Sequence, residues 1–289
     1  MDRNAEILEL MRVIAKKETG IRLVNLYKGL PIIYEASIAS IESTTLRLSC
    51  NKYQLACLFL THEVYIIGQD IQGTIHADVT GLIPARDEAI LANLAYVDKP
   101  FILRDQIRVE PTDPMKAVLK VRGSISTIET QLADISLDGL GVYIDRNSFH
   151  PKLFLIGNDL TVILPLSDTL QSRPWAGPSA ANTGDLSTRF TRESMRGLAF
   201  LGEDAQVQRR PAEPLPPPSA KTKLTAQGTI VNIRPELLKG RYRLGLRLFE
   251  EDRVRFIISQ FISNRQSEII REFRTVYDSL TRSDKTKNP

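Results

Sequence analysis

LADISLDGLGVYID, residues Leu132–Asp145, is the stretch that decides the fold of this chain. It predicts the end of one β-strand, a tight turn and the start of the next strand, because apolar and β-branched residues flank a small, polar, glycine-containing centre. The centre holds Asp134, Ser136 and Gly139 in a DxSxxG pattern. These three residues suit a simple hairpin turn, and they also suit the floor of a ligand site.

Further β-type runs follow the chain on both sides of this hairpin. In MKAVLKVRG, apolar residues alternate with mostly polar ones, which predicts one buried and one wet face of an antiparallel barrel wall. DLTVILPL predicts another strand, and GTIVNIRPELLKGRYRLGLRLF predicts a hairpin with Arg241, Arg243 and Arg247 on the solvent face. The segment DRVRFIISQFISNRQSEIIREFRTVYDSL carries an apolar stripe at helical spacing, so a helix follows the last strand.

The first hundred residues are also rich in short β-type runs. A helix with an apolar stripe is expected over residues 4–18, and strands follow it, among them the apolar run Ala56–Leu60. The segment Ala85–Val97 predicts a short helix, with Ile90, Leu91 and Leu94 facing inward. A small β-barrel or split barrel is the economical architecture for these runs.

Length and composition suggest two domains in a chain of 289 residues, of which 42% are hydrophobic and 25% charged. We expect a mainly β protein of two tandem small barrels, the first split-barrel-like, with an N-terminal and a C-terminal helix. The domains are predicted at residues 1–100 and 101–282. The second is interrupted at about 167–223 by an insertion that contains the proline-rich, polar stretch EDAQVQRRPAEPLPPPSAKT.

Charge and cysteine content narrow the class of protein. The chain has 38 Lys plus Arg against 34 Asp plus Glu, a net charge of +4, which allows an anionic partner but does not predict a nucleic-acid binder. Cys50 and Cys57 have no second pair for a zinc site and are expected to be buried thiols. The polar N-terminus has no signal-peptide core, and no apolar run approaches the roughly 18 residues that span a bilayer. We expect a cytoplasmic protein without direct membrane insertion.

Two arginines, Arg104 and Arg108 in RDQIR, precede the hairpin. Their order, RxxxR, then an alternating strand, then DxSxxG, resembles the PilZ family of cyclic di-GMP receptors. The RxxxR spacing also occurs at Arg192/Arg196 and Arg243/Arg247, whereas DxSxxG occurs once. The resemblance covers about residues 101–280 apart from the insertion and implies a C-terminal PilZ barrel. By its placement, the preceding β domain is similar to the N-terminal domain of flagellar-brake type PilZ proteins.

The resemblance implies that Arg104, Arg108, Asp134, Ser136 and Gly139 bind cyclic di-GMP. A guanidinium fork matches the adjacent N7 and O6 acceptors of guanine and also pairs with phosphate. A carboxylate accepts hydrogen bonds from the N1–H and N2–H₂ edge of guanine, a serine offers a small hydroxyl, and a glycine allows close approach or positive φ. None of the five is arranged for bond breaking, so neither an enzyme nor a cofactor is expected, and the output should pass through a protein partner.

Alternatives remain at this stage. The arginines suit ordinary solvated linker charges, and Asp134 and Ser136 suit turn formation alone. A PilZ-like adaptor without nucleotide binding, a flavin enzyme built on a split barrel and a nucleic-acid binder are the rival functions. Leu103 stands directly before RxxxR and cannot hold an extra guanine as an arginine can, which favours one ligand molecule per chain.

Overall fold

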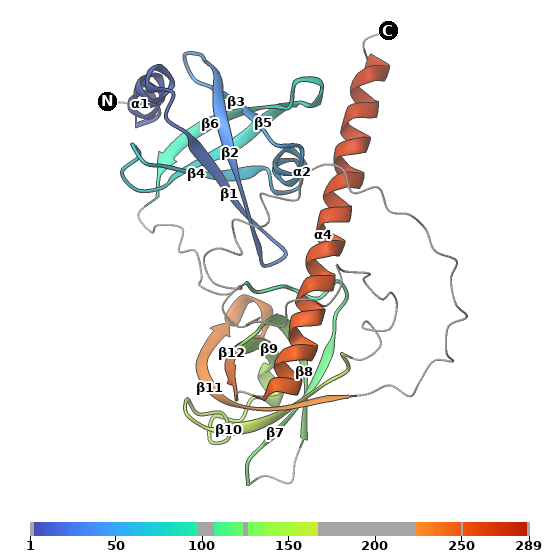
Figure 1. Cartoon of the computed structure of the whole chain (residues 1–289). Helices are drawn as coiled ribbons and strands as arrows, with labels where there is room; N and C mark the ends of the chain where they lie inside the picture. Colours follow the sequence, from blue (N-terminus) through green and yellow to red (C-terminus); the bar gives the residue numbers. More distant parts are fainter. Residues whose placement is uncertain (1–2, 98–106, 124–126, 167–222, 250, 288–289) are drawn as a thin grey trace, which may run out of the picture. The chain divides into compact units, whose positions relative to one another are not determined.

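The computed structural model describes residues 3–97, 107–123, 127–166, 223–249 and 251–287. The chain divides into two compact units, one formed by Met1–Arg104 with Gln266–Pro289 and the other by Asp105–Arg265. Each unit contains one closed six-stranded barrel (Figure 1). The predicted fold class, mainly β with two tandem barrels and a helix near each end, is confirmed. The domain limits stay predictions, and the expected insertion, except Lys223, lies outside the described residues.

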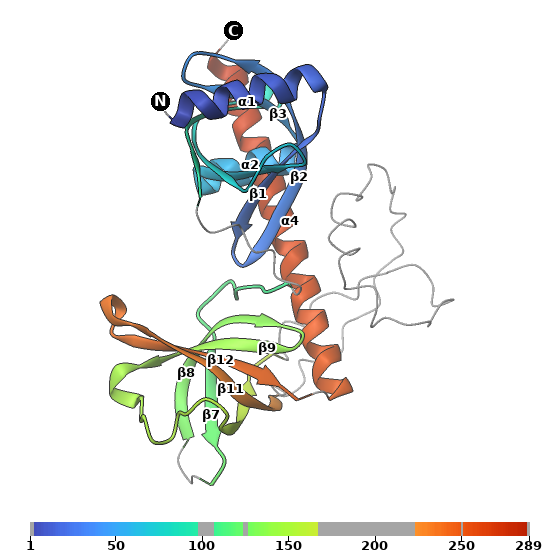
Figure 2. The same ribbon diagram turned by 90° about the vertical axis from the view of Figure 1, so that its left-hand side faces the viewer.

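The first barrel follows a leading helix and is closed by pairing of its first and fourth strands. Its strand order is β1-β2-β3-β6-β5-β4, and every pairing is antiparallel. The elements are α1 (Arg3–Lys17), β1 (Ile21–Tyr27), β2 (Leu30–Ile41), β3 (Leu46–Cys50), α2 (Lys52–Thr61), β4 (Glu63–Gly68), β5 (Ile75–Ile83), the 3-10 turn Pro84–Arg86 and β6 (Glu88–Tyr96). Helix α1 packs against β2 and β6 with the predicted apolar stripe inward (Figure 2).

The run Ala56–Leu60 is helical, so the strand predicted there is wrong. Asn51 caps the N-terminus of α2, where its side chain accepts a hydrogen bond from the Tyr53 backbone N–H, and His62 ends the helix in the left-handed conformation. The buried residues of α2 are consecutive rather than periodic. A short apolar run of this kind does not distinguish a strand from a buried helix.

The segment from Glu88 to Tyr96 is strand β6, so the helix predicted over Ala85–Val97 is wrong. The pairing with β5 shifts register next to Asn93, which has a φ of 54°. This bulge brings Leu94 back to the buried face three residues after Leu91. A spacing of three imitates a helical stripe, which is why the pattern of this segment predicts a helix.

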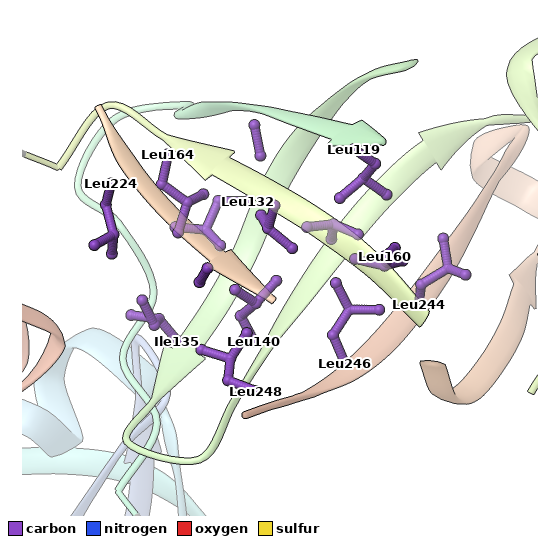
Figure 3. Packing of buried hydrophobic residues seen from close by; sticks show 14 of the residues in the cluster. Leu119, Leu132, Ile135, Leu140, Leu160, Leu164, Leu224, Leu244, Leu246 and Leu248 are labelled. Carbon is purple, nitrogen blue, oxygen red and sulfur yellow. The ribbon is translucent and has the colours of Figure 1, made fainter. Parts of the chain in front are cut away.

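The second barrel has the strand order β10-β11-β12-β9-β8-β7 and is closed by pairing of β7 with β10. Its elements are β7 (Lys116–Val121), β8 (Thr127–Ser136), β9 (Gly139–Asp145), the 3-10 turn Arg146–Ser148, β10 (Asp159–Leu164), β11 (Leu224–Glu236), the 3-10 turn Leu237–Lys239 and β12 (Arg241–Leu248). Leucines from all six strands fill its interior (Figure 3). The predicted alternation of β7 is confirmed, with Ala117, Leu119 and Val121 buried.

The two barrels share one connectivity, although no internal repeat is visible in the sequence. When six is added to each strand number of the first barrel, the order becomes β7-β8-β9-β12-β11-β10. This is the strand order of the second barrel read in the opposite direction. The second hairpin strand carries a bulge at the same place in both: Ala39 is skipped between Ile38 and Ser40, and Ala133 between Leu132 and Asp134. This shared register aligns the β2–β3 pair with the β8–β9 pair residue by residue.

The C-terminal helix α4 (Asp252–Lys287) belongs to both units. Its first part adds Val254 and Ile258 to the core of the second barrel. Its later part packs on the first barrel, where the rings of Phe273 and Tyr27 lie 5.2 Å apart. The Tyr277 hydroxyl donates to Asp87 at 2.7 Å, and this bond together with burial raises the pKa of Tyr277 to about 12.

Both cysteines are buried in the first unit as free thiols, as predicted. Burial raises the pKa of Cys50 and of Cys57 to about 12, so both stay protonated at neutral pH. Within the part of the chain that the structure describes, no helix combines the length and apolar character needed to cross a bilayer.

Candidate functional site

The DxSxxG turn joins β8 to β9 in the second barrel. Ser136 and Gly139 are the last pair of this ladder, and the Ser136 hydroxyl donates to the Gly139 carbonyl oxygen at 3.0 Å. Since this bond uses the hydroxyl proton, the lone pairs of the Ser136 oxygen are left to accept an N–H donor. Gly139 has no positive φ, and its role is close packing: a Cβ there would lie under 3.0 Å from the Leu246 carbonyl oxygen.

Asp134 lies just after the bulge of β8, and its side chain is only 5% exposed. Its cross-strand partner is Gly141, and a Cβ on Gly141 would lie 2.9 Å from the Asp134 Oδ2 atom. The carboxylate therefore lies over the backbone of β9, in space that only a glycine leaves open. Gly141, in the first part of β9, thus leaves the space that the Asp134 carboxylate occupies.

Arg108 lies beside Asp134 because the next residue, Val109, pairs with β8. Val109 is fully buried and forms two backbone hydrogen bonds with Ile135, of 2.9 and 3.0 Å. This bridge holds the preceding residue beside β8, where the Arg108 Nη1 atom lies 3.5 Å from the Asp134 Oδ1 atom. Arg104, the other arginine of the predicted pair, lies outside the described residues.

A second arginine, Arg243 of β12, donates from Nη2 to the Asp134 Oδ2 atom. The sequence pattern predicts Arg243 on the solvent face of its strand, but it does not predict the ion pair that Arg243 makes with a buried carboxylate. Next to it, the Arg241 guanidinium stacks 3.5 Å from the centre of the Tyr143 ring. The alternation RYRLGLRL correctly predicts an outward face for the arginines, but it does not identify the strand beside β12.

The resulting cluster combines one buried carboxylate with two partly exposed guanidinium groups and one hydroxyl acceptor. The side chains of Arg108 and Arg243 are 38% and 34% exposed, so both keep donors available to a ligand. Such a site can bind an anion through the arginines and a planar pair of N–H donors through Asp134 and Ser136.

The first barrel has no DxSxxG motif, and other residues occupy the positions that correspond to Asp134 and Gly141. By the shared bulge, Ser40 occupies the position of Asp134, and Arg47 occupies the position of Gly141. Arg47 lies 3.5 Å from Glu42 and 3.9 Å from Glu88, so its own neighbours pair with it. The carboxylate and the bare glycine backbone are thus features of the second barrel.

Metal-ligating side chains do not gather elsewhere: within the described ranges no three His, Cys, Asp or Glu residues form a group that could hold a metal ion.

Comparison with models of known protein families gives no match, and no curated protein sequence matches the chain. Solved structures of similar fold include the MrkH–c-di-GMP complex from K. pneumonia, 12% identical over 93% of this chain and 96% of that one, with a TM-score of 0.39. The inhibitor of motility MotI/DgrA from Bacillus subtilis is 12% identical over 86% and 96%, with a TM-score of 0.36. The PilZ domain of YcgR from Escherichia coli, solved with c-di-GMP, is 12% identical over 58% and 94%, with a TM-score of 0.35. A PilZ domain is among the solved structures that are similar to this chain.

Proposed function

We propose that this chain is a PilZ-type receptor for cyclic di-GMP and that the ligand binds at Asp134 on the second barrel. The observation that carries the proposal is the meeting of Arg108 with a nearly buried Asp134 at the DxSxxG turn. Guanine offers N1–H and N2–H₂ to a carboxylate and N7 and O6 to a guanidinium, and each phosphate offers an anion. Arg104, Ser136 and Gly139 complete the proposed site. Because the first barrel has Arg47 at the position of Gly141, one ligand per chain is expected.

Isothermal titration calorimetry of the full chain with cyclic di-GMP tests this function, with GTP and linear pGpG as controls. We expect binding of the cyclic dinucleotide at a stoichiometry near one and much weaker binding of both controls. A flat titration with folded protein would contradict the proposal and leave an adaptor that acts through protein contacts. A stoichiometry near two would refute the single site.

Replacing either arginine of the pair should weaken binding without unfolding the barrel. One bidentate contact from Arg to guanine contributes about 1–3 kcal/mol, so we expect Arg104→Ala and Arg108→Ala each to raise the dissociation constant about tenfold to a hundredfold. Calorimetry measures the change. The double variant Arg192→Ala/Arg196→Ala is the matched control, because it removes arginines of the same spacing and should bind as the wild type does. Unchanged affinity in both single variants would place the ligand elsewhere.

The response to the ligand is proposed to be a change in the relative arrangement of the two units, which alters a surface for a protein partner. Arg104 and Arg108 lie in the sequence where the two units join. A ligand that binds one arrangement better shifts the population towards it. Small-angle scattering should therefore change on saturation with cyclic di-GMP, and superimposable profiles would count against this response. The proposed receptor acts in the cytoplasm of a bacterium. The process that it regulates is proposed to be motility, surface polysaccharide production or biofilm formation.

A further inference from the structure

The wall of the second barrel beside Asp134 continues from β9 onto β12. Gly141 of β9 lies directly opposite Gly245 of β12, and Tyr143 lies opposite Arg243 in the same ladder. Tyr143, Arg243 and Gly245 are partly exposed beside buried neighbours and face outward, and the strand period places the buried Gly141 on the same face. The Asp134 carboxylate of β8 covers Gly141, and Arg243 of β12 borders the same part of this face.

Arg243 holds the oxygen of Asp134 that a guanine would need. The Watson–Crick edge of guanine, N1–H with N2–H₂ on one carbon, is itself a guanidine fragment, so it offers a carboxylate the same pair of donors as an arginine does. Arg243 already donates to Oδ2, and Arg108 lies 3.5 Å from Oδ1. A guanine that binds both oxygens therefore competes with Arg243 for the Asp134 Oδ2 atom.

A displaced Arg243 requires a new anion. The side chain is 34% exposed on the ligand-facing wall, and the dinucleotide that takes its place carries two phosphates. Once guanine occupies the carboxylate, the guanidinium groups of Arg108 and Arg243 face this dianion together. Charge-assisted contacts between arginine and phosphate are among the strongest hydrogen bonds in proteins.

We infer that Arg243 is a third ligand-binding arginine: it neutralises Asp134 in the empty site and moves onto a phosphate of the bound dinucleotide. The inference rests on the proposed function and adds to it a residue outside both sequence motifs, on a strand that follows the 167–223 insertion. In this exchange the carboxylate replaces one guanidine-type partner with another, and the arginine replaces a carboxylate with a phosphate. The buried carboxylate keeps hydrogen-bond donors at both stages, first from a guanidinium cation and then from neutral guanine, and the arginine keeps an anion.

The test is calorimetry of Arg243→Met with cyclic di-GMP. Methionine keeps much of the side-chain stem and removes every donor, so we expect the dissociation constant to rise about tenfold or more. Arg234→Met is the matched control, because it removes the same charge from Arg234, the exposed cross-strand neighbour of Arg243 on β11. The affinity of this variant for cyclic di-GMP should stay within about twofold of that of the wild type. If the wild type and Arg243→Met bind cyclic di-GMP with equal affinity, this inference alone is overturned. If the wild type does not bind cyclic di-GMP, the proposed function is overturned.

Two further measurements, the salt dependence of the affinity and the melting temperature, distinguish phosphate binding by Arg243 from a purely structural role. If the arginine contacts phosphate, the affinity of Arg243→Met should fall less steeply with added salt than that of the wild type, because one ion pair with the ligand is lost. A structural role lowers the melting temperature and leaves this salt dependence unchanged, which would also overturn the inference. Should Arg243→Met fail to fold, Arg243→Lys keeps a cation beside Asp134 but lacks the fork, and weaker binding at an unchanged melting temperature is expected. Wild-type affinity in Arg243→Lys would count against the proposal.

Discussion

The variant Asp134→Asn is expected to lose nearly all affinity for cyclic di-GMP while keeping the shape of the side chain. The amide has one acceptor oxygen where the carboxylate has two, and its NH₂ group faces donors. Losing one partner of a buried charged pair costs about 2–5 kcal/mol, which corresponds to a rise of the dissociation constant by about thirtyfold to several thousandfold. Calorimetry on the full chain measures it.

Asp138→Asn is the control for this prediction, since it makes the same chemical change four residues away in the same turn. Asp138 is half-exposed and lies 3.7 Å from Arg255, so its loss should leave affinity unchanged. Thermal melting of both variants shows whether the barrel remains folded. Near wild-type binding by a folded Asp134→Asn protein would show that the carboxylate does not contact the ligand.

The central part of this site could be predicted from sequence because its residues are local or lie on adjoining segments. Asp134, Ser136 and Gly139 occupy one turn, and Arg108 reaches that turn through the bridge between Val109 and Ile135. Arg243 could not be predicted, since it is separated from Asp134 by 109 residues. Only strand order and register bring β12 beside β9, and alternation within a strand does not encode either.

The errors in the first barrel have a related origin. The α2 segment and strand β6 were assigned from short apolar patterns, and both depend on features that such patterns do not contain. The cap at Asn51 begins a helix whose buried residues are consecutive, and the bulge at Asn93 changes a strand period of two into a spacing of three. The same kind of bulge, at Ala39 and Ala133, relates the two barrels although their sequences show no repeat.

Gly139→Ala should unfold or strongly destabilise the second barrel. The added Cβ would lie under 3.0 Å from the carbonyl oxygen of Leu246, a backbone atom of β12 that no side-chain rotation can move. We expect a loss of about 3 kcal/mol, the upper end of the usual range for overpacking. At about 2–4 °C for each kcal/mol, the melting temperature of this unit should fall by about 6–12 °C. Affinity for the ligand is then lost together with the fold.

Gly141→Ala separates this effect from a direct effect on the site. Its Cβ would meet the Asp134 carboxylate at 2.9 Å, and that side chain can move where the Leu246 carbonyl cannot. The expected result is weaker binding with a much smaller fall in melting temperature. Gly20→Ala, where a Cβ meets nothing within 4 Å, should change neither property. The explanation would be wrong if Gly139→Ala had the same melting temperature as Gly20→Ala and bound the ligand as the wild type does. The close approach of β9 to β12 would then not explain the glycine in the DxSxxG turn.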